Sequence, residues 1–167
     1  VAVVNAAVLL QESGQPKIRF TTNLPNKPVI TQMDQTLISQ ALINLIKNAG
    51  EAIEIRQRKL GYDILGEIRI SVEQTSMNVI IKIEDNGIGL PQDRTRLFEP
   101  YVTTRDKGTG LGLAIVKKII EEHGGTLLLE DAQAFNAAPF YGALASIALP
   151  RVSNKHLHLN EGTNPDE

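Results

Sequence analysis

Two asparagines one helical turn apart are the first residues of this sequence that could do chemistry. Asn44 and Asn48 lie in the segment NLIKNAGEAI, with Lys47 between them. A carboxamide oxygen is an uncharged ligand that suits a Mg²⁺ ion already neutralised by phosphates. The segment could therefore hold the metal and triphosphate end of a nucleotide. The alternative is that these side chains are solvated polar residues at the margin of an amphipathic helix.

A carboxylate in the segment VIIKIEDNGIGLP is predicted to point toward the interior. Val79, Ile81 and Ile83 are apolar and share one face of the predicted strand. Asp85 continues the same alternation and so falls on that face. An inward carboxylate is costly unless a donor meets it, and the exocyclic amine of adenine is such a donor. Gly87 and Gly89 have no Cβ atom, so the backbone could approach a flat ring. The alternative is a β-hairpin, which Asp-Asn-Gly between apolar runs also favours.

Alternating glycines stand directly before a predicted helix in the segment GTGLGLAIV. Gly108, Gly110 and Gly112 would let backbone N–H groups and the helix N-terminus surround an anion such as phosphate. A dinucleotide-binding fold is not indicated, because no strand leads into these glycines. A Walker A loop is excluded, because Gly-Lys-Ser/Thr occurs nowhere in the chain. The alternative is a tight loop whose glycines only allow close helix packing.

The segment YVTTRDK combines hydroxyl groups with cations just before these glycines. Thr103, Thr104, Arg105 and Lys107 could donate hydrogen bonds to phosphates from a lid that closes over them. An ordinary exposed loop would have the same composition. Phe98, just upstream, is expected to anchor the loop through apolar contacts.

Helices and strands must position these residues, and the patterns predict an α/β two-layer sandwich. Apolar residues from Ile38 to Ile53 share one arc of a helix that Asp34 caps and that runs to about Arg58. The other expected elements are helices over 1–11 and from about Thr109 to His123, strands over 17–22, 29–31, 67–73, 77–84, 126–130 and 143–149, and a helical turn over 91–97. The expected architecture is a mixed, largely antiparallel sheet with about three helices packed on one face.

Composition excludes several classes of protein. Lys and Arg number 17 and Asp and Glu 19, so a formal charge of −2 leaves no basic excess for binding nucleic acid. The absence of cysteine excludes disulfides, thiolate metal sites and a cysteine nucleophile. No apolar run approaches the roughly 18 residues of a membrane helix, so no membrane contact is expected from these residues.

The order of the segments resembles one known family. The asparagine helix, the Asp-x-Gly-x-Gly turn, the Phe-bearing loop and the Gly-x-Gly-x-Gly helix are similar to the ATP-binding domain shared by sensor histidine kinases, gyrase, Hsp90 and MutL. In that family's terms NLIKNAGEAI resembles the N box, DNGIGLP the first glycine box, LFEPYVTTR the F box and GTGLGLAIV the second glycine box. The run from FEPYVTTR to EEHGG resembles the nitrogen-regulation sensor kinases of the NtrB and NtrY type. The resemblance spans roughly residues 17–150.

The resemblance implies ATP and Mg²⁺ as ligands, with a role for each matching residue. Asn48 is implied to ligate the metal, and Asn44 to support that end of the site. Asp85 is implied to accept a hydrogen bond from the adenine amine, while Gly87 and Gly89 shape the pocket. The implied phosphate-binding residues lie on the lid and the second glycine box: Thr103, Thr104, Arg105, Lys107, Gly108, Thr109, Gly110, Leu111, Gly112 and Leu113.

One position departs from the family pattern. Many of these kinases carry a basic residue one turn after the second asparagine, where this chain has the uncharged and acidic run AGEA over 49–52. Lys47 or a lid cation must therefore neutralise the phosphates. The ATPase clamps of the family instead need a glutamate base on this helix, and Glu51 is the nearest candidate.

A sensor histidine kinase implies partners outside this chain. The γ-phosphoryl group goes to a histidine on a separate two-helix dimerisation domain, and a response regulator acts downstream. The His-Glu/Asp motif of such a domain is absent here; His123 is interpreted as a capping residue at a helix end, and His156 and His158 as tail residues. The chain alone is expected to be monomeric and cytoplasmic, with a helical lead-in over 1–16, the ATP-binding domain over 17–150 and a polar tail over 151–167. Two alternatives remain open: a serine kinase of the anti-sigma-factor type, and a nucleotide-binding module without transfer.

Overall fold

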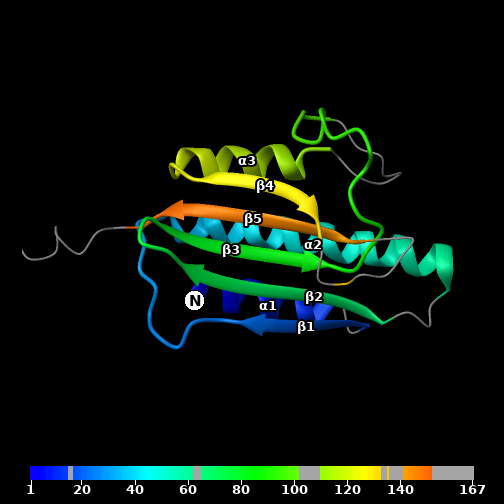
Figure 1. Ribbon diagram of the computed structural model, residues 1–167, viewed down its shortest axis with the longest axis horizontal. Helices are drawn as coiled ribbons and strands as arrows, with labels where there is room; N and C mark the ends of the chain where they lie inside the picture. Colours follow the sequence, from blue (N-terminus) through cyan, green and yellow to red (C-terminus); the bar gives the residue numbers. More distant parts are fainter. Residues whose placement is uncertain (15–16, 62–64, 102–109, 133–134, 136–140, 152–167) are drawn as a thin grey trace, which may run out of the picture.

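A computed structural model of the 167-residue chain describes residues 1–14, 17–61, 65–101, 110–132, 135 and 141–151. Five strands form one sheet in the order β1-β2-β3-β5-β4, and helices cover one of its faces (Figure 1). β1 runs parallel to β2, and every other neighbouring pair is antiparallel. The elements are α1 (Ala2–Gly14), β1 (Ile18–Asn23), α2 (Gln35–Leu60), β2 (Gly66–Gln74), β3 (Asn78–Asp85), α3 (Gly112–Glu122), β4 (Thr126–Asp131) and β5 (Ala143–Pro150). The predicted mixed sheet with helices on one face is confirmed.

The long helix α2 begins and packs as its sequence predicts. The side chain of Asp34 accepts hydrogen bonds from the amides of Thr36 at 2.8 Å and Leu37 at 3.0 Å, so it caps the helix. The predicted arc faces the sheet, and Ile38 and Ile53 at its two ends are at most 1% exposed. Hydrophobic burial along this arc holds α2 across the sheet and fixes the side chains at its margin.

Strand β3 carries the predicted alternation into the core. Val79, Ile81 and Ile83 are buried, and Asp85 on the same row is only 5% exposed. The strand pairs with β2 on one side and β5 on the other, with Asp85 opposite Ala143. The hairpin alternative at Asp-Asn-Gly is wrong, because the chain leaves the sheet after Asp85 and the next strand of the described chain is β4.

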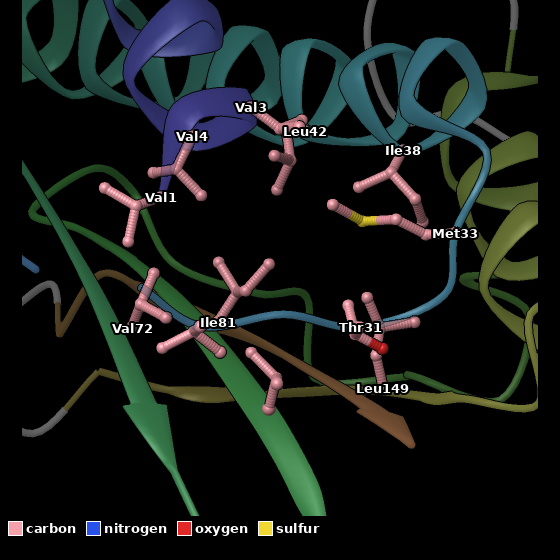
Figure 2. Close-up of a pocket in the computed structure, with 12 residues that line it drawn as sticks. Val1, Val3, Val4, Thr31, Met33, Ile38, Leu42, Val72, Ile81 and Leu149 are labelled. Carbon is pink, nitrogen blue, oxygen red and sulfur yellow. The ribbon is translucent and has the colours of Figure 1, made fainter. Parts of the chain in front are cut away.

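Helix α1 closes one end of the core. Its buried residues recur at helical spacing and include Val3 and Val4. Together with α2, the sheet and the segment around Met33, they enclose a small apolar cavity of about 20 Å³ (Figure 2). Val72 of β2 also lines this cavity and points into it.

Helix α3 starts three residues later than predicted. Gly110 has φ +68°, which a right-handed helix cannot contain, so the helix begins at Gly112; Thr109 lies outside the described residues. Val116 and Ile120 are fully buried, whereas Ile115 is 37% exposed. The helix ends where expected, because Gly124 takes a left-handed φ of +68°.

Two smaller elements differ from expectation. The segment 29–31 was expected to be a strand, but the described residues 24–34 form none and cross the strand ends instead (Figure 1). Pro25 and Pro28 have no amide hydrogen for a ladder, and Thr31 instead donates its hydroxyl to the carbonyl oxygen of Pro150 at 2.6 Å. The helical turn expected over 91–97 is present only in its second half, where the amide of Leu97 donates to the carbonyl oxygen of Arg94 at 3.3 Å.

Candidate functional site

The end of β3, the beginning of β5 and the beginning of α3 lie at the same end of the molecule, next to the middle of α2 (Figure 1). Asp85 is the last residue of β3, and its carboxylate Oδ1 accepts a hydrogen bond from the amide of Gly87 at 2.8 Å. This bond fixes the carboxylate at the point where the chain turns away from the sheet. The structure thus places the predicted inward carboxylate at the edge of the core.

The turn after Asp85 packs directly against α2. A Cβ atom on Gly87 would lie 2.6 Å from the carbonyl carbon of Ala52, so only glycine permits this approach. The amide of Ile88 donates to the carbonyl oxygen of Ala52 at 3.1 Å. Ala52 lies one helical turn beyond Asn48, so α2 connects the carboxylate to the asparagines.

A set of polar contacts that the sequence did not predict holds the same turn to both β2 and α2. The side chain of Asn86 accepts from the amide of Glu67 at 2.8 Å and donates to the carbonyl oxygen of Leu65 at 2.9 Å. The guanidinium of Arg56 donates to the carbonyl oxygen of Asn86. Arg56 is 6% exposed on the buried side of α2. A charged residue on an otherwise apolar arc was the signal that could have revealed this contact.

Gly142, also missed, fits against the backbone of Asp85. It has φ +72°, and a Cβ atom there would lie 1.8 Å from the carbonyl oxygen of Asp85. Gly89, with φ +82°, approaches in turn so closely that its Cβ atom would lie 3.2 Å from the carbonyl oxygen of Gly142. Two glycines far apart in sequence therefore let three backbone segments meet around Asp85.

Asn48, on α2, lies beside the first residue of α3. A Cβ atom on Gly112 would be 3.8 Å from Nδ2 and 4.0 Å from Oδ1 of Asn48. Leu111 precedes the helix and has no side-chain acceptor for the N–H groups of the first turn. Asn44 is half-buried one turn before Asn48 on α2, and Lys47 is exposed beside them. A carboxamide and a helix N-terminus therefore adjoin, as a metal and phosphate site requires.

The two ends of the predicted lid are held together. The amide of Tyr101 donates to the carbonyl oxygen of Gly110 at 3.1 Å, and Tyr101 has φ +64°. Phe98 is half-buried, with the ammonium of Lys117 5.2 Å from its ring centre, so its anchoring contact includes α3. The predicted lid and glycine-box residues that lie outside the described residues are Thr103, Thr104, Arg105, Lys107, Gly108 and Thr109. Leu113, the last predicted phosphate-site residue, packs partly against the core.

The donors at this site suit a metal that brings its own ligands. Within the described part of the chain, no three His, Asp or Glu side chains gather where they could hold a metal ion. Uncharged carboxamides such as Asn44 and Asn48 suit Mg²⁺ only when phosphate oxygens complete its coordination. The residues present therefore fit a magnesium–nucleotide complex better than a free ion.

The fold and the donors at this site are those of a nucleotide-binding domain, and comparison with known proteins identifies its family. Residues 33–151 match the family model described as "Histidine kinase-, DNA gyrase B-, and HSP90-like ATPase", and the chain belongs to this family. The nitrogen regulation protein NtrY of Azorhizobium caulinodans is 48% identical over 133 residues, which cover 78% of this chain and 17% of that protein.

Solved structures agree with the family. The nucleotide-free catalytic domain of histidine kinase ThkA superposes with a TM-score of 0.74 at 30% identity, covering 90% of this chain and 91% of that one. ThkA in complex with the response regulator TrrA superposes with a TM-score of 0.69 at 28% identity, covering 92% of this chain and 41% of that one. The fold is therefore that of histidine kinase catalytic domains.

The chain covers only part of its curated relatives. It spans 17% of NtrY and 22% of the histidine kinase AtoS of Escherichia coli. Among the described residues, no helix has the length and apolar character needed to cross a membrane.

Proposed function

We propose that this chain binds Mg·ATP and presents the γ-phosphate to a histidine on a separate domain, as the catalytic part of a sensor histidine kinase. The proposal rests on the position of α2, which lies against both ends of the site. Ala52 supports the turn after Asp85, and Asn48 adjoins the first residue of α3. A nucleotide lying along this stretch of α2 would meet the carboxylate at its base and the carboxamides at its phosphates.

Asp85 is the proposed acceptor for the adenine amine. The bond from Gly87 orients its carboxylate, because one oxygen is already fixed at 2.8 Å. Gly87 and Gly89 lack side chains that would fill the space beside the ring. The adenine end is thus organised by contacts that involve backbone atoms of three segments.

Asn48 and Asn44 are the proposed residues at the metal. A bound Mg²⁺ would neutralise phosphate charge and orient the phosphates. The proposed phosphate contacts come from the beginning of α3 and from the lid: Gly110, Leu111, Gly112, Thr103, Thr104, Arg105, Lys107, Gly108 and Thr109. The exposed Lys47, or a lid cation, supplies positive charge in place of the basic residue that many family members have after the second asparagine.

The chemistry asked of these residues is positioning and electrostatic stabilisation. In phosphoryl transfer the enzyme aligns the attacking and leaving groups and stabilises the charge that develops. The attacking imidazole lies on another domain, so this chain supplies the alignment of the γ-phosphate with that imidazole. The relative AtoS and the structural neighbour ThkA are named histidine kinases, which favours this reading over a serine kinase or an ATPase clamp based on Glu51.

A response regulator is the proposed downstream partner. The ThkA complex with TrrA, which superposes on this chain, supports that proposal. We further propose that the chain alone is monomeric, and a dimer in sedimentation at micromolar concentration would contradict this.

Transfer can be tested with radiolabelled nucleotide. The chain would be incubated with Mg²⁺ and γ-³²P-labelled ATP, together with a separately produced histidine-bearing dimerisation domain from a sensor histidine kinase. The expected product is label on that domain that is stable to base and labile to acid. The same domain with its histidine replaced by glutamine is the control and should stay unlabelled. Acid-stable label would favour the serine kinase, and phosphate release unaffected by the acceptor would favour an ATPase.

A further inference from the structure

We infer that His123 is a positioning residue of the nucleotide site, acting through one hydrogen bond that joins the far ends of α3 and α2. The amide of Asp34, the N-cap of α2, donates to Nε2 of His123 at 3.0 Å. This contact joins residues 89 positions apart in the chain. The inference rests on the proposed function, because it concerns how the two helices at that site are held.

The hydrogen-bond partner of Nδ1, the other ring nitrogen, shows which nitrogen of His123 carries the proton. Nδ1 of His123 lies 2.6 Å from the carbonyl oxygen of Ile119, one turn earlier in α3. A carbonyl can only accept, so Nδ1 carries the proton, and Nε2 is then free of hydrogen and accepts from Asp34. The ring is thus a neutral bridge with one assigned tautomer. Capping of α3, predicted from the sequence, accounts for the Nδ1 contact but not for the one at Nε2.

The bridge lies at the opposite end of the helix pair from the proposed metal site. α3 begins at Gly112 beside Asn48 and ends at His123 beside Asp34, so the two helices run antiparallel. Asn48 and Asp34 are 14 residues apart on α2, a separation of about 21 Å along a helix. The bond at His123 therefore lies far from the place where Gly112 approaches Asn48. Loss of the bond would let α3 pivot about its buried residues Val116 and Ile120, and the first residues of α3 would then shift relative to Asn48.

The N-cap makes this bond well suited to control α2. All three hydrogen-bonding groups of Asp34 are engaged. Its side chain caps the amides of Thr36 and Leu37, its carbonyl oxygen accepts from the amide of Ile38, and its own amide donates to His123. The ring of His123 therefore contacts the rigid start of the helix that carries both asparagines. A shift of α3 is not absorbed by a loose loop at this point.

Two similar substitutions separate capping from positioning. Gln at position 123 can place an amide oxygen near the position of Nε2 and so accept from Asp34. Asn at position 123 can place its amide nitrogen near the position of Nδ1 and so donate to the Ile119 carbonyl, but it is too short to reach Asp34. His123→Gln therefore keeps the bridge and His123→Asn keeps only the cap.

The measurement is calorimetric titration with ADP, with and without Mg²⁺, for wild type and both variants. We expect His123→Asn to weaken binding in Mg²⁺ about fivefold, as for the loss of one hydrogen bond. We expect a smaller change without Mg²⁺, because the adenine end does not depend on the position of α3. His123→Gln should restore most of the wild-type affinity and its dependence on Mg²⁺. Thermal unfolding of each variant identifies a temperature at which all are folded.

The outcomes distinguish this inference from the proposed function. If wild type binds ADP and His123→Asn binds it equally well, the positioning role is wrong and the nucleotide site stands. Equal weakening with and without Mg²⁺ in both variants would also overturn it, since that pattern indicates a general loss of structure. If wild type itself binds no ADP, the proposed function fails.

Discussion

Replacing Gly142 by alanine tests whether the close approach of β5 fixes Asp85. Gly142 has φ +72°, and an alanine Cβ would lie 1.8 Å from the carbonyl oxygen of Asp85. Gly124 offers a matched control, because its φ of +68° is nearly the same but the nearest atom to a Cβ there is Pro150 Cγ at 3.5 Å. The two substitutions share the cost of a left-handed backbone and differ in the steric clash.

The difference between the two variants can be estimated from these distances. A left-handed conformation costs an alanine about 1–2 kcal/mol, so Gly124→Ala should lower the free energy of unfolding by roughly that amount. Gly142→Ala must in addition move backbone by more than roughly an ångström, and such overpacking typically costs about 1–3 kcal/mol more. Because the displaced atoms belong to Asp85, ADP binding should weaken about tenfold in Gly142→Ala and clearly less in Gly124→Ala, where the nearest atom belongs to Pro150.

Urea unfolding and ADP calorimetry on both variants provide the assay. A Gly142→Ala variant that is no less stable than Gly124→Ala, within about 0.5 kcal/mol and with an unchanged m value, would refute the expected steric clash. A Gly142→Ala variant that is destabilised yet binds ADP as wild type does would refute the expected effect on Asp85. That second result would mean that Asp85 keeps its position without support from β5.

Two further predictions concern stability and titration. Val72→Ile should add about 0.5–1 kcal/mol to the free energy of unfolding, because the added methyl group fills the apolar cavity of about 20 Å³ that Val72 lines; a lower urea midpoint would show that the cavity cannot take it. The Thr95 hydroxyl and amide donate to Asp93 and lower the pKa of its carboxyl, so this contact stabilises the fold above the ordinary carboxyl pKa and is lost as pH falls through the lowered value. An NMR titration should show the Asp93 pKa rising in Thr95→Val, and an unchanged value would contradict the assignment.

Local patterns predicted the elements of this fold because each depends on residues close in sequence. Asp34 caps α2 through the amides two and three residues later. Helical periodicity places the apolar arc of α2, and strand periodicity places the inward row that ends at Asp85. The same periodicity failed over 29–31, because alternation over so few residues cannot outweigh prolines that remove ladder donors. It also placed the start of α3 too early, because sequence alone did not show that Gly110 is left-handed.

Contacts between distant residues could not be predicted from those patterns. Gly142 looked like an ordinary loop glycine, and only its packing on Asp85 shows why a side chain there is excluded. The sequence indicated that His123 ends a helix, yet its bond to Asp34 depends on the antiparallel packing of two helices. Asn86 was taken as part of a turn, whereas its side chain joins that turn to β2.

The substitution Asp85→Asn tests whether Asp85 accepts a hydrogen bond from the adenine amine of a nucleotide bound on α2, as we propose. In that variant the amide of Gly87 holds the carboxamide oxygen, as it holds Oδ1 at 2.8 Å in the wild type, so an NH₂ group faces the base. ADP presents a donor there and IDP an acceptor. Calorimetric titration with each nucleotide in Mg²⁺ should show that wild type prefers ADP, that the variant binds ADP at least about tenfold more weakly, and that it binds IDP in preference to ADP. An unchanged affinity for ADP in Asp85→Asn, or no adenine nucleotide binding by wild type, would rule out the proposed adenine site at Asp85.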